Sequence, residues 1–144
     1  MSMANQVNVF AQNQPGRLER LTEVLLDEGI NIRAITISGA EDYGVIKLLV
    51  DDPHKAFDAL QREGFSAFLK EVIAVVMDDR PGGLHRICRV LGESGVNVED
   101  AYGFVFQDRK TAILVVEVEK VTEAEDILRA KGLEFLSDAE LYSL

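Results

Sequence analysis

The feature that most constrains the fold is an internal repeat. Pro15-Gly16 recurs 66 residues later as Pro81-Gly82. The offset then grows to 68, which indicates a change of loop length after the second strand. Self-similarity of this kind indicates one structural unit built twice, so we expect two domains, at residues 1–70 and 71–144. The matched pairs include Val9 and Val75, Leu18 and Leu84, Arg20 and Arg86, Gly29 and Gly95, Asn31 and Asn97, and Gly64 and Gly132.

Hydrophobic periodicity predicts the order strand, helix, strand, strand, helix, strand in each half. In the first half, strands are expected at 7–12, 32–38, 44–50 and 65–69, with helices from Leu18 to Gly29 and from Pro53 to Glu63. In the second half, strands are expected at 72–77, 98–106, 111–118 and 133–136, with helices at 84–93 and 121–130, a polar turn at 107–110 and a short edge segment from Asp138. This order predicts an α+β fold of two ferredoxin-like βαββαβ repeats, with antiparallel sheets and helices on one face.

Composition excludes several functions. The net charge of −10 and the pI of about 4.6 disfavour binding to nucleic acid or to an anionic membrane surface. No apolar run approaches the length of a membrane span, and no signal peptide is visible. The single cysteine, Cys88, cannot form an intramolecular disulfide, so we expect a cytoplasmic protein. Cys88 itself is expected to be a small buried apolar residue.

The loop after the first strand of each half is the candidate binding feature. It reads Asn13-Gln14-Pro15-Gly16-Arg17-Leu18 in the first half and Asp79-Arg80-Pro81-Gly82-Gly83-Leu84 in the second, and each copy leads directly into a helix. The first amides of a helix lack internal partners and carry the positive end of the dipole, so they suit a carboxylate. Asn13 or Asp79 suits an ammonium group as an acceptor.

From spacing alone, a structural reading of these motifs is favoured. Pro-Gly is a common turn before a helix, and Gly-Ile-Asn is an ordinary helix-stop sequence. His54 and His85 have no second ligand at metal spacing, and no catalytic constellation emerges, so neither a metal site nor an enzyme is expected. The acidic run at 117–126 is expected to be a solvated face. The alternating Tyr102, Phe104 and Phe106 are expected to be core or sheet contacts.

The two motif copies resemble the ACT domain. The resemblance rests on Asn13-x-Pro15-Gly16-x-Leu18 with Gly29-Ile30-Asn31-Ile32, and on Asp79-Arg80-Pro81-Gly82-Gly83-Leu84 with Gly95-Val96-Asn97-Val98. It covers nearly the whole chain as two ACT repeats, so no attached catalytic domain is expected. It implies a regulatory protein that binds an amino acid between ACT domains without a cofactor. It also implies a homodimer and a partner that is a metabolic enzyme or a regulator.

The resemblance further implies which residues contact the ligand. They are the loop residues and those that open the second strand: Asn13, Gln14, Pro15, Gly16, Arg17, Leu18, Asn31 and Ile32 in the first repeat, and Asp79, Arg80, Gly82, Gly83, Leu84, Asn97 and Val98 in the second. Asp79 in place of asparagine adds a negative charge that disfavours a carboxylate, so the first loop is expected to bind better. Serine-sensing members carry a histidine where this chain has Ala11 and Met77, so the ligand side chain stays open. The alternative is a ligand-free regulatory subunit that docks an amino-acid metabolic enzyme.

Overall fold

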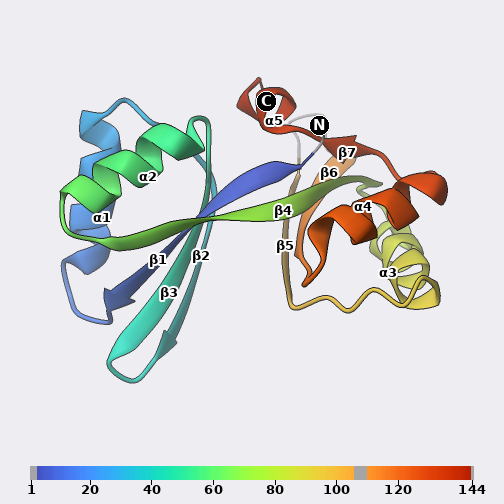
Figure 1. Cartoon of the computed structure of the whole chain (residues 1–144), viewed down its shortest axis with the longest axis horizontal. Helices are drawn as coiled ribbons and strands as arrows, with labels where there is room; N and C mark the ends of the chain where they lie inside the picture. Colours follow the sequence, from blue (N-terminus) through green and yellow to red (C-terminus); the bar gives the residue numbers. More distant parts are fainter. Residues whose placement is uncertain (1–2, 106–109, 144) are drawn as a thin grey trace. The chain divides into compact units, whose positions relative to one another are not determined.

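The computed structural model describes residues 3–105 and 110–143, which form two compact units (Figure 1). The N-terminal unit is Asn5–Lys70 and the C-terminal unit is Glu71–Leu141, each with a few residues from the opposite end of the chain. In each unit, two helices lie against one face of an antiparallel sheet (Figure 1). The predicted α+β fold of two βαββαβ repeats is thus confirmed.

The N-terminal unit has the strand order β2-β3-β1-β4. Gln12 and Ala40 both pair with Tyr43 at the start of the third strand. The loop after the first strand therefore lies at the same end of the sheet as the turn between the second and third. The elements are β1 (Ala4–Gln12), α1 (Arg17–Asp27), β2 (Ile32–Ala40), β3 (Tyr43–Val50), α2 (Pro53–Arg62) and the first part of β4 (Ser66–Asp78).

The C-terminal unit repeats this order as β5-β6-β4-β7. Here β6 pairs antiparallel with β4 and β5, and the short β7 pairs with the other edge of β4. The elements are the second part of β4, α3 (Gly83–Glu93), β5 (Asp100–Val105), β6 (Thr111–Glu117), α4 (Val121–Ala130), β7 (Phe135–Leu136) and α5 (Asp138–Tyr142). In the part of the chain that is described, no helix is long and apolar enough to cross a membrane.

Each unit has its own hydrophobic core between the sheet and its two helices. In α1 the buried residues recur at helical spacing, which fixes the face that packs on the sheet. The start of α2 is fixed by Asp52, whose side chain accepts a hydrogen bond from the Lys55 N–H at 3.2 Å, with Pro53 in the first turn. Core residues include Leu21, Leu25, Leu48 and Leu60 in the N-terminal unit, and Ile73, Ile87, Val116 and Leu128 in the C-terminal unit.

Several predicted elements differ from the structure, most of them only in their bounds. The strands expected at 65–69 and 72–77 are one strand, β4, because no glycine or proline interrupts the chain between them. The segment from Asp138 is the helix α5 rather than a sheet edge. Ser137 and Glu140 cap it reciprocally: the Ser137 N–H donates to Glu140 Oε1 at 3.1 Å, and the Glu140 N–H donates to Ser137 Oγ at 3.3 Å. β5 begins at Asp100 instead of Val98.

One burial prediction was wrong, and a second holds for only part of its residues. Cys88 is exposed, because Ile87 and Leu91 define the buried face of α3 and Cys88 shares a face with Leu84, which is itself 49% exposed. Within the acidic run, Glu125 is buried at 8% exposure and lies beside Arg129.

The aromatic stripe agrees with its prediction in part. Tyr102 and Phe104 are half-buried on β5. Phe106 and residues 107–109 of the predicted turn lie outside the described residues.

Candidate functional site

The loop between β1 and α1 turns through a glycine in the left-handed conformation. Gly16 has φ 89° and ψ −14° and is the N-cap of α1, with no side chain capping the helix. The Arg17 N–H donates to the Gln14 carbonyl at 3.2 Å. Within the described ranges, the N–H groups of Leu18 and Glu19 have no acceptor. These two donors are therefore open to a ligand.

Asn13 joins this loop to the turn between β2 and β3. Its backbone N–H donates to the Asp42 carbonyl at 2.7 Å, and its side-chain Nδ2 donates to the Glu41 carbonyl at 3.2 Å. Sequence reasoning predicted a turn at 39–43 but did not include it in the candidate site, although the antiparallel order of the predicted strands places it beside the loop. The side chain of Asn13 is exposed, and no donor among the described residues bonds its Oδ1. Asn13 thus holds the turn through Nδ2 and keeps an open acceptor at Oδ1.

The other predicted residues of the first loop have different environments. Gln14 and Pro15 are exposed, and Leu18 is 39% exposed. The Arg17 guanidinium lies over the Phe65 ring, 4.7 Å from its centroid. This cation–π contact ties the start of α1 to the residue before β4. Arg17 is therefore held by an aromatic ring of the core.

The loop between β4 and α3 has the same backbone form. Gly82 has φ 91° and ψ −13° and is the N-cap of α3, again without a side-chain cap. The Gly83 N–H donates to the Arg80 carbonyl at 3.0 Å. The N–H groups of Leu84 and His85 lack an acceptor among the residues described, as do their counterparts in the first loop. Both units therefore present the same open helix start.

A pocket of about 180 Å³ lies beside the second loop, lined by Met77, Asp78, Arg80, Pro81, Gly82, Gly83 and Arg86. Arg80 forms an ion pair with Asp78, with 3.1 Å between Nη2 and Oδ2. Asp79 is exposed, and its backbone N–H donates to the Lys110 carbonyl at 2.8 Å. The second loop thus carries both acidic and basic side chains, whereas the first loop carries Asn13 in the place of Asp79.

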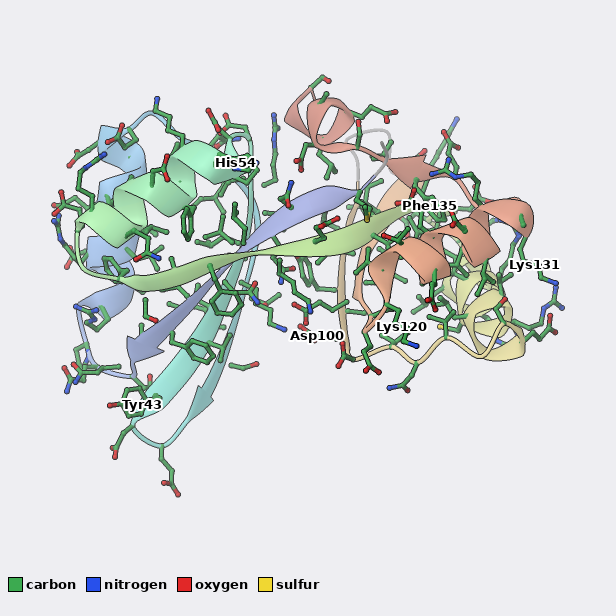
Figure 2. The ribbon with its side chains drawn as sticks, in the orientation of Figure 1. Tyr43, His54, Asp100, Lys120, Lys131 and Phe135 are labelled. Atoms are coloured by element: carbon green, nitrogen blue, oxygen red, sulfur yellow. The ribbon has the colours of Figure 1, made fainter. Side chains whose placement is uncertain are left out.

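The asparagines that open the second strands lie far from these loops within each unit. Asn31 exchanges hydrogen bonds with Asp51 at the far end of β3: its N–H donates to Oδ1, and its carbonyl accepts from the Asp51 N–H, both at 3.1 Å. Asn13 bonds Asp42 at the near end, which Tyr43 marks in Figure 2. A strand rises about 3.3 Å per residue. The extended segment from Asp42 to Asp51 therefore places Asn13 and Asn31 about 30 Å apart. The predicted site residues of one unit therefore form two groups, one at each end of the sheet.

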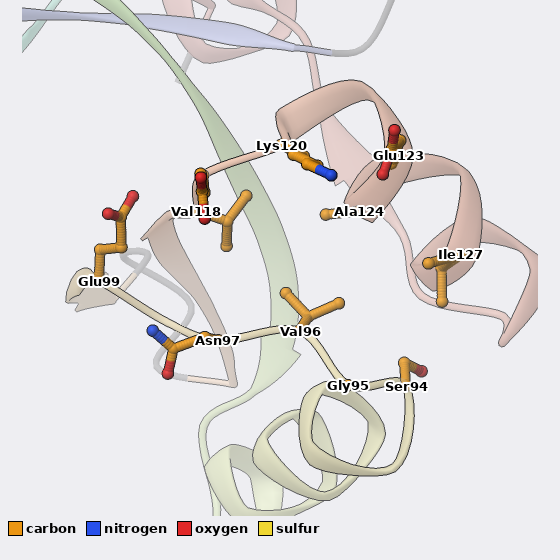
Figure 3. A pocket seen from close by; sticks show the side chains of 11 residues that line it. Ser94, Gly95, Val96, Asn97, Glu99, Val118, Lys120, Glu123, Ala124 and Ile127 are labelled. Atoms are coloured by element: carbon orange, nitrogen blue, oxygen red, sulfur yellow. The ribbon is translucent and has the colours of Figure 1, made fainter.

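Asn97 lies at the equivalent end of the C-terminal unit, beside a pocket of about 360 Å³. Val96 points toward α4 and contributes to the apolar floor, whereas the Asn97 amide points away from that helix (Figure 3). Val98 is 38% exposed, while Ile32 packs against the core of its unit. The pocket is lined by Ser94, Gly95, Val96, Asn97, Glu99, Val118, Glu119, Lys120, Glu123, Ala124 and Ile127.

Both histidines are exposed. The described part of the chain holds no group of three or more His, Cys, Asp or Glu side chains that could bind a metal.

These features define a small α+β domain with an open helix start, built twice. The family model described as an ACT domain pair matches residues 1–144, so the chain belongs to the ACT domain pair family. The resemblance to a tandem ACT protein is thus confirmed. No curated protein matches the sequence.

Solved structures share this fold. Protein BT0572 from Bacteroides thetaiotaomicron is 31% identical, with a TM-score of 0.92 over 99% of this chain and 98% of its own. The regulatory subunit of aspartate kinase from Thermus thermophilus, in its ligand-free form, is 18% identical, with a TM-score of 0.65 over 90% of this chain and 91% of its own. The regulatory subunit from Thermus flavus is also 18% identical, with a TM-score of 0.60 over 90% and 94% of the two chains.

Proposed function

We propose that this chain is a cytoplasmic regulatory protein that binds a free amino acid and does not catalyse a reaction. The observation that carries the proposal is the open helix start beside Asn13. The N–H groups of Leu18 and Glu19 suit the ligand carboxylate, and the open Oδ1 of Asn13 suits its ammonium group. The two ends of an amino acid are thus matched by groups of opposite polarity in one loop. Membership of the ACT family supports a regulatory role for this site.

The separation of Asn13 and Asn31 supports a ligand held between two ACT units. A free amino acid is far shorter than the distance of about 30 Å between these residues. Within one unit it therefore contacts either the loop or the strand-opening asparagine. A ligand that contacts both kinds of residue lies where the loop of one unit meets the second strand of another. The second unit belongs to the same chain or to the other copy in a homodimer.

A thermal-shift panel of the twenty amino acids tests the proposal. A ligand present at about 100 times its dissociation constant stabilises the folded state by about 2.7 kcal/mol, which raises the midpoint by about 5–10 °C. We expect such a shift with one amino acid or a few related ones. A folded sample that shifts with none of them contradicts the proposal and favours a ligand-free subunit that docks a partner enzyme.

Two substitutions at Asn13 separate its structural role from ligand binding. Asn13→Ala removes both the Nδ2 donor to Glu41 and the Oδ1 acceptor, whereas Asn13→Asp removes the donor and keeps an acceptor. Both variants are expected to lose stability, because both lose the donor to Glu41. Asn13→Asp is expected to retain a ligand-induced shift, reduced by its negative charge near the ligand carboxylate, whereas Asn13→Ala loses the shift. Asn31→Ala is expected to lose the shift without loss of stability, because its side-chain amide makes no hydrogen bond among the described residues. If both Asn13 variants lose the shift equally, ligand binding requires the contact between Asn13 and the turn at Glu41, and not the Oδ1 acceptor.

A further inference from the structure

The helices of the N-terminal unit are joined by an ion-pair network centred on Arg20. Arg20 on α1 pairs with Glu23 one turn later at 2.5 Å, and with Glu63 at the end of α2 at 3.1 Å. Each of these side chains is partly exposed, and the positive charge of Arg20 is balanced by two carboxylates. The network therefore links α1 to α2 and leaves no positive charge uncompensated.

The C-terminal unit has the opposite charges at the two acidic positions. Arg86 on α3 is equivalent to Arg20, and Arg89 is equivalent to Glu23. Lys131 is equivalent to Glu63: each is the C-cap of its helix, and each is followed by a glycine with positive φ. In the N-terminal unit, Arg20 forms ion pairs with the residues at the other two positions. Because the two units share one fold, the three basic side chains lie at equivalent, neighbouring positions in the C-terminal unit. We call Arg86, Arg89 and Lys131 the basic triad.

The basic triad lacks strong counterions. Among the described residues, no acidic side chain is within ion-pair distance of Arg86 or Lys131. Arg89 reaches Glu93 at 3.9 Å, with both side chains well exposed, so that pair is weak. All three members are exposed, and Lys131 extends from the end of α4 (Figure 2). Like charges one turn apart on a helix repel each other, so the triad destabilises the unit until an anion neutralises it.

We propose that the basic triad and the adjoining pocket beside the second loop bind a small multivalent anion. Arg86 belongs to both features, and the pocket of about 180 Å³ is large enough for a phosphate or carboxylate group. A guanidinium fork bonds either group through two parallel N–H donors. Arg89 and Lys131 then face the remaining charge of the ligand, which makes a diphosphate or a tricarboxylate a better ligand than a monoanion. The acidic net charge of −10 disfavours a nucleic acid on the same surface.

This inference goes beyond the amino-acid site of the first loop, because Arg86 and Arg89 lie on α3 and Lys131 lies at the end of α4. The adjoining pocket shares Arg80, Gly82 and Gly83 with the second copy of that loop. Pyrophosphate and citrate are the probes, with inorganic phosphate and chloride for comparison, in a buffer free of other multivalent anions. Saturating pyrophosphate or citrate is expected to raise the unfolding midpoint by about 5–10 °C. Arg86→Gln is expected to weaken the affinity by about tenfold or more, because one charge-assisted bidentate contact is lost.

A charge-reversal variant provides the sharper test. Arg89→Glu combined with Lys131→Glu gives the C-terminal unit the ion-pair pattern of the N-terminal unit. Without anion, this variant is expected to unfold a few degrees higher than the wild type, and its shift with pyrophosphate or citrate is expected to vanish. The matched control is Glu23→Arg combined with Glu63→Lys, which removes the counterions of Arg20 in the other unit. It is expected to unfold at a lower temperature and to retain the anion shift.

Three results overturn the proposal. The first is the absence of any shift with pyrophosphate or citrate in the wild type. The second is an equal shift in the charge-reversal variant, which would place the anion elsewhere. The third is an unchanged affinity in Arg86→Gln. If an amino acid still raises the unfolding midpoint of the charge-reversal variant, the amino-acid site and the anion site are separate. Each proposal can then fail without the other.

Discussion

Gly83 packs against the backbone of Asp78 so closely that a Cβ on Gly83 would lie 2.0 Å from the Asp78 carbonyl oxygen. The obstacle is main chain, so no side chain can move aside to make room. Gly83→Ala is therefore expected to lower the free energy of unfolding by about 1–3 kcal/mol. Gly92→Ala is the matched control on the same helix, because nothing lies within 4 Å of its added Cβ. We expect it to be neutral or stabilising by about 0.5 kcal/mol. Urea denaturation measures both, and equal stability of the two variants would contradict the close approach.

Glu41 is the one described residue other than glycine with a positive φ, at 56°. A side chain in this conformation costs roughly 1 kcal/mol, which glycine avoids. Glu41→Gly is thus expected to raise the free energy of unfolding by about 0.5–1 kcal/mol, since the lost strain outweighs the added chain entropy. Asp42→Gly at the next residue has no such strain to relieve and is expected to destabilise by a similar amount. Thermal unfolding of both variants checks this, and two shifts of the same sign would refute it.

The repeat in the sequence was enough to predict the order of elements and the two open helix starts. Periodicity reports which face of each element is buried, and matching glycines report where the chain must turn. Hydrophobic periodicity and the positions of glycines are both local properties of the sequence, and both units have them. The predicted helix at 121–130 agrees with α4 at both ends.

The features that the sequence did not predict depend on contacts with residues distant in the chain, or on sequence signals other than hydrophobic periodicity. The helix α5 has a capping signature in Ser137 and Glu140, three residues apart, that periodicity alone does not reveal. Cys88 follows a buried isoleucine, but one residue along a helix turns the side chain by about 100° and onto the exposed face. The basic triad is visible in the sequence only after the ion pairs of the N-terminal unit identify which positions meet.

The carboxylate of Glu125 is buried beside Arg129 on α4. The side chain of Glu125 is 10% exposed, and its Oε1 lies 2.7 Å from Arg129 Nη2. Arg129 also lies over the ring of Phe135, 5.3 Å from its centroid. Arg129→Met deprives a buried carboxylate of its cation and is expected to lower the free energy of unfolding by about 1–3 kcal/mol.

The double variant Glu125→Met with Arg129→Met controls for packing. It removes the buried charge together with its cation, so it is expected to recover most of the stability that Arg129→Met loses. Chemical denaturation of the two single variants and the double variant gives the coupling energy. A double variant less stable than Arg129→Met would show that the pair acts through packing and not through charge.

The phenol of Tyr102 gives the C-terminal unit a dependence on alkaline pH. Burial raises the pKa of Tyr102 well above its usual value of 10.0, and the negative charges of Glu117 and Asp100 raise it further. The folded state therefore favours the neutral phenol, and unfolding releases a proton above about pH 10. This contribution to stability is fully present below about pH 10 and is lost as the pH rises through the folded-state pKa. Tyr102→Phe keeps the ring but cannot ionise, so its unfolding midpoint is expected to fall less steeply between pH 9 and pH 11 than that of the wild type. Thermal unfolding across this range measures the two slopes, and parallel slopes would mean that Tyr102 ionises equally easily in the folded and unfolded chain.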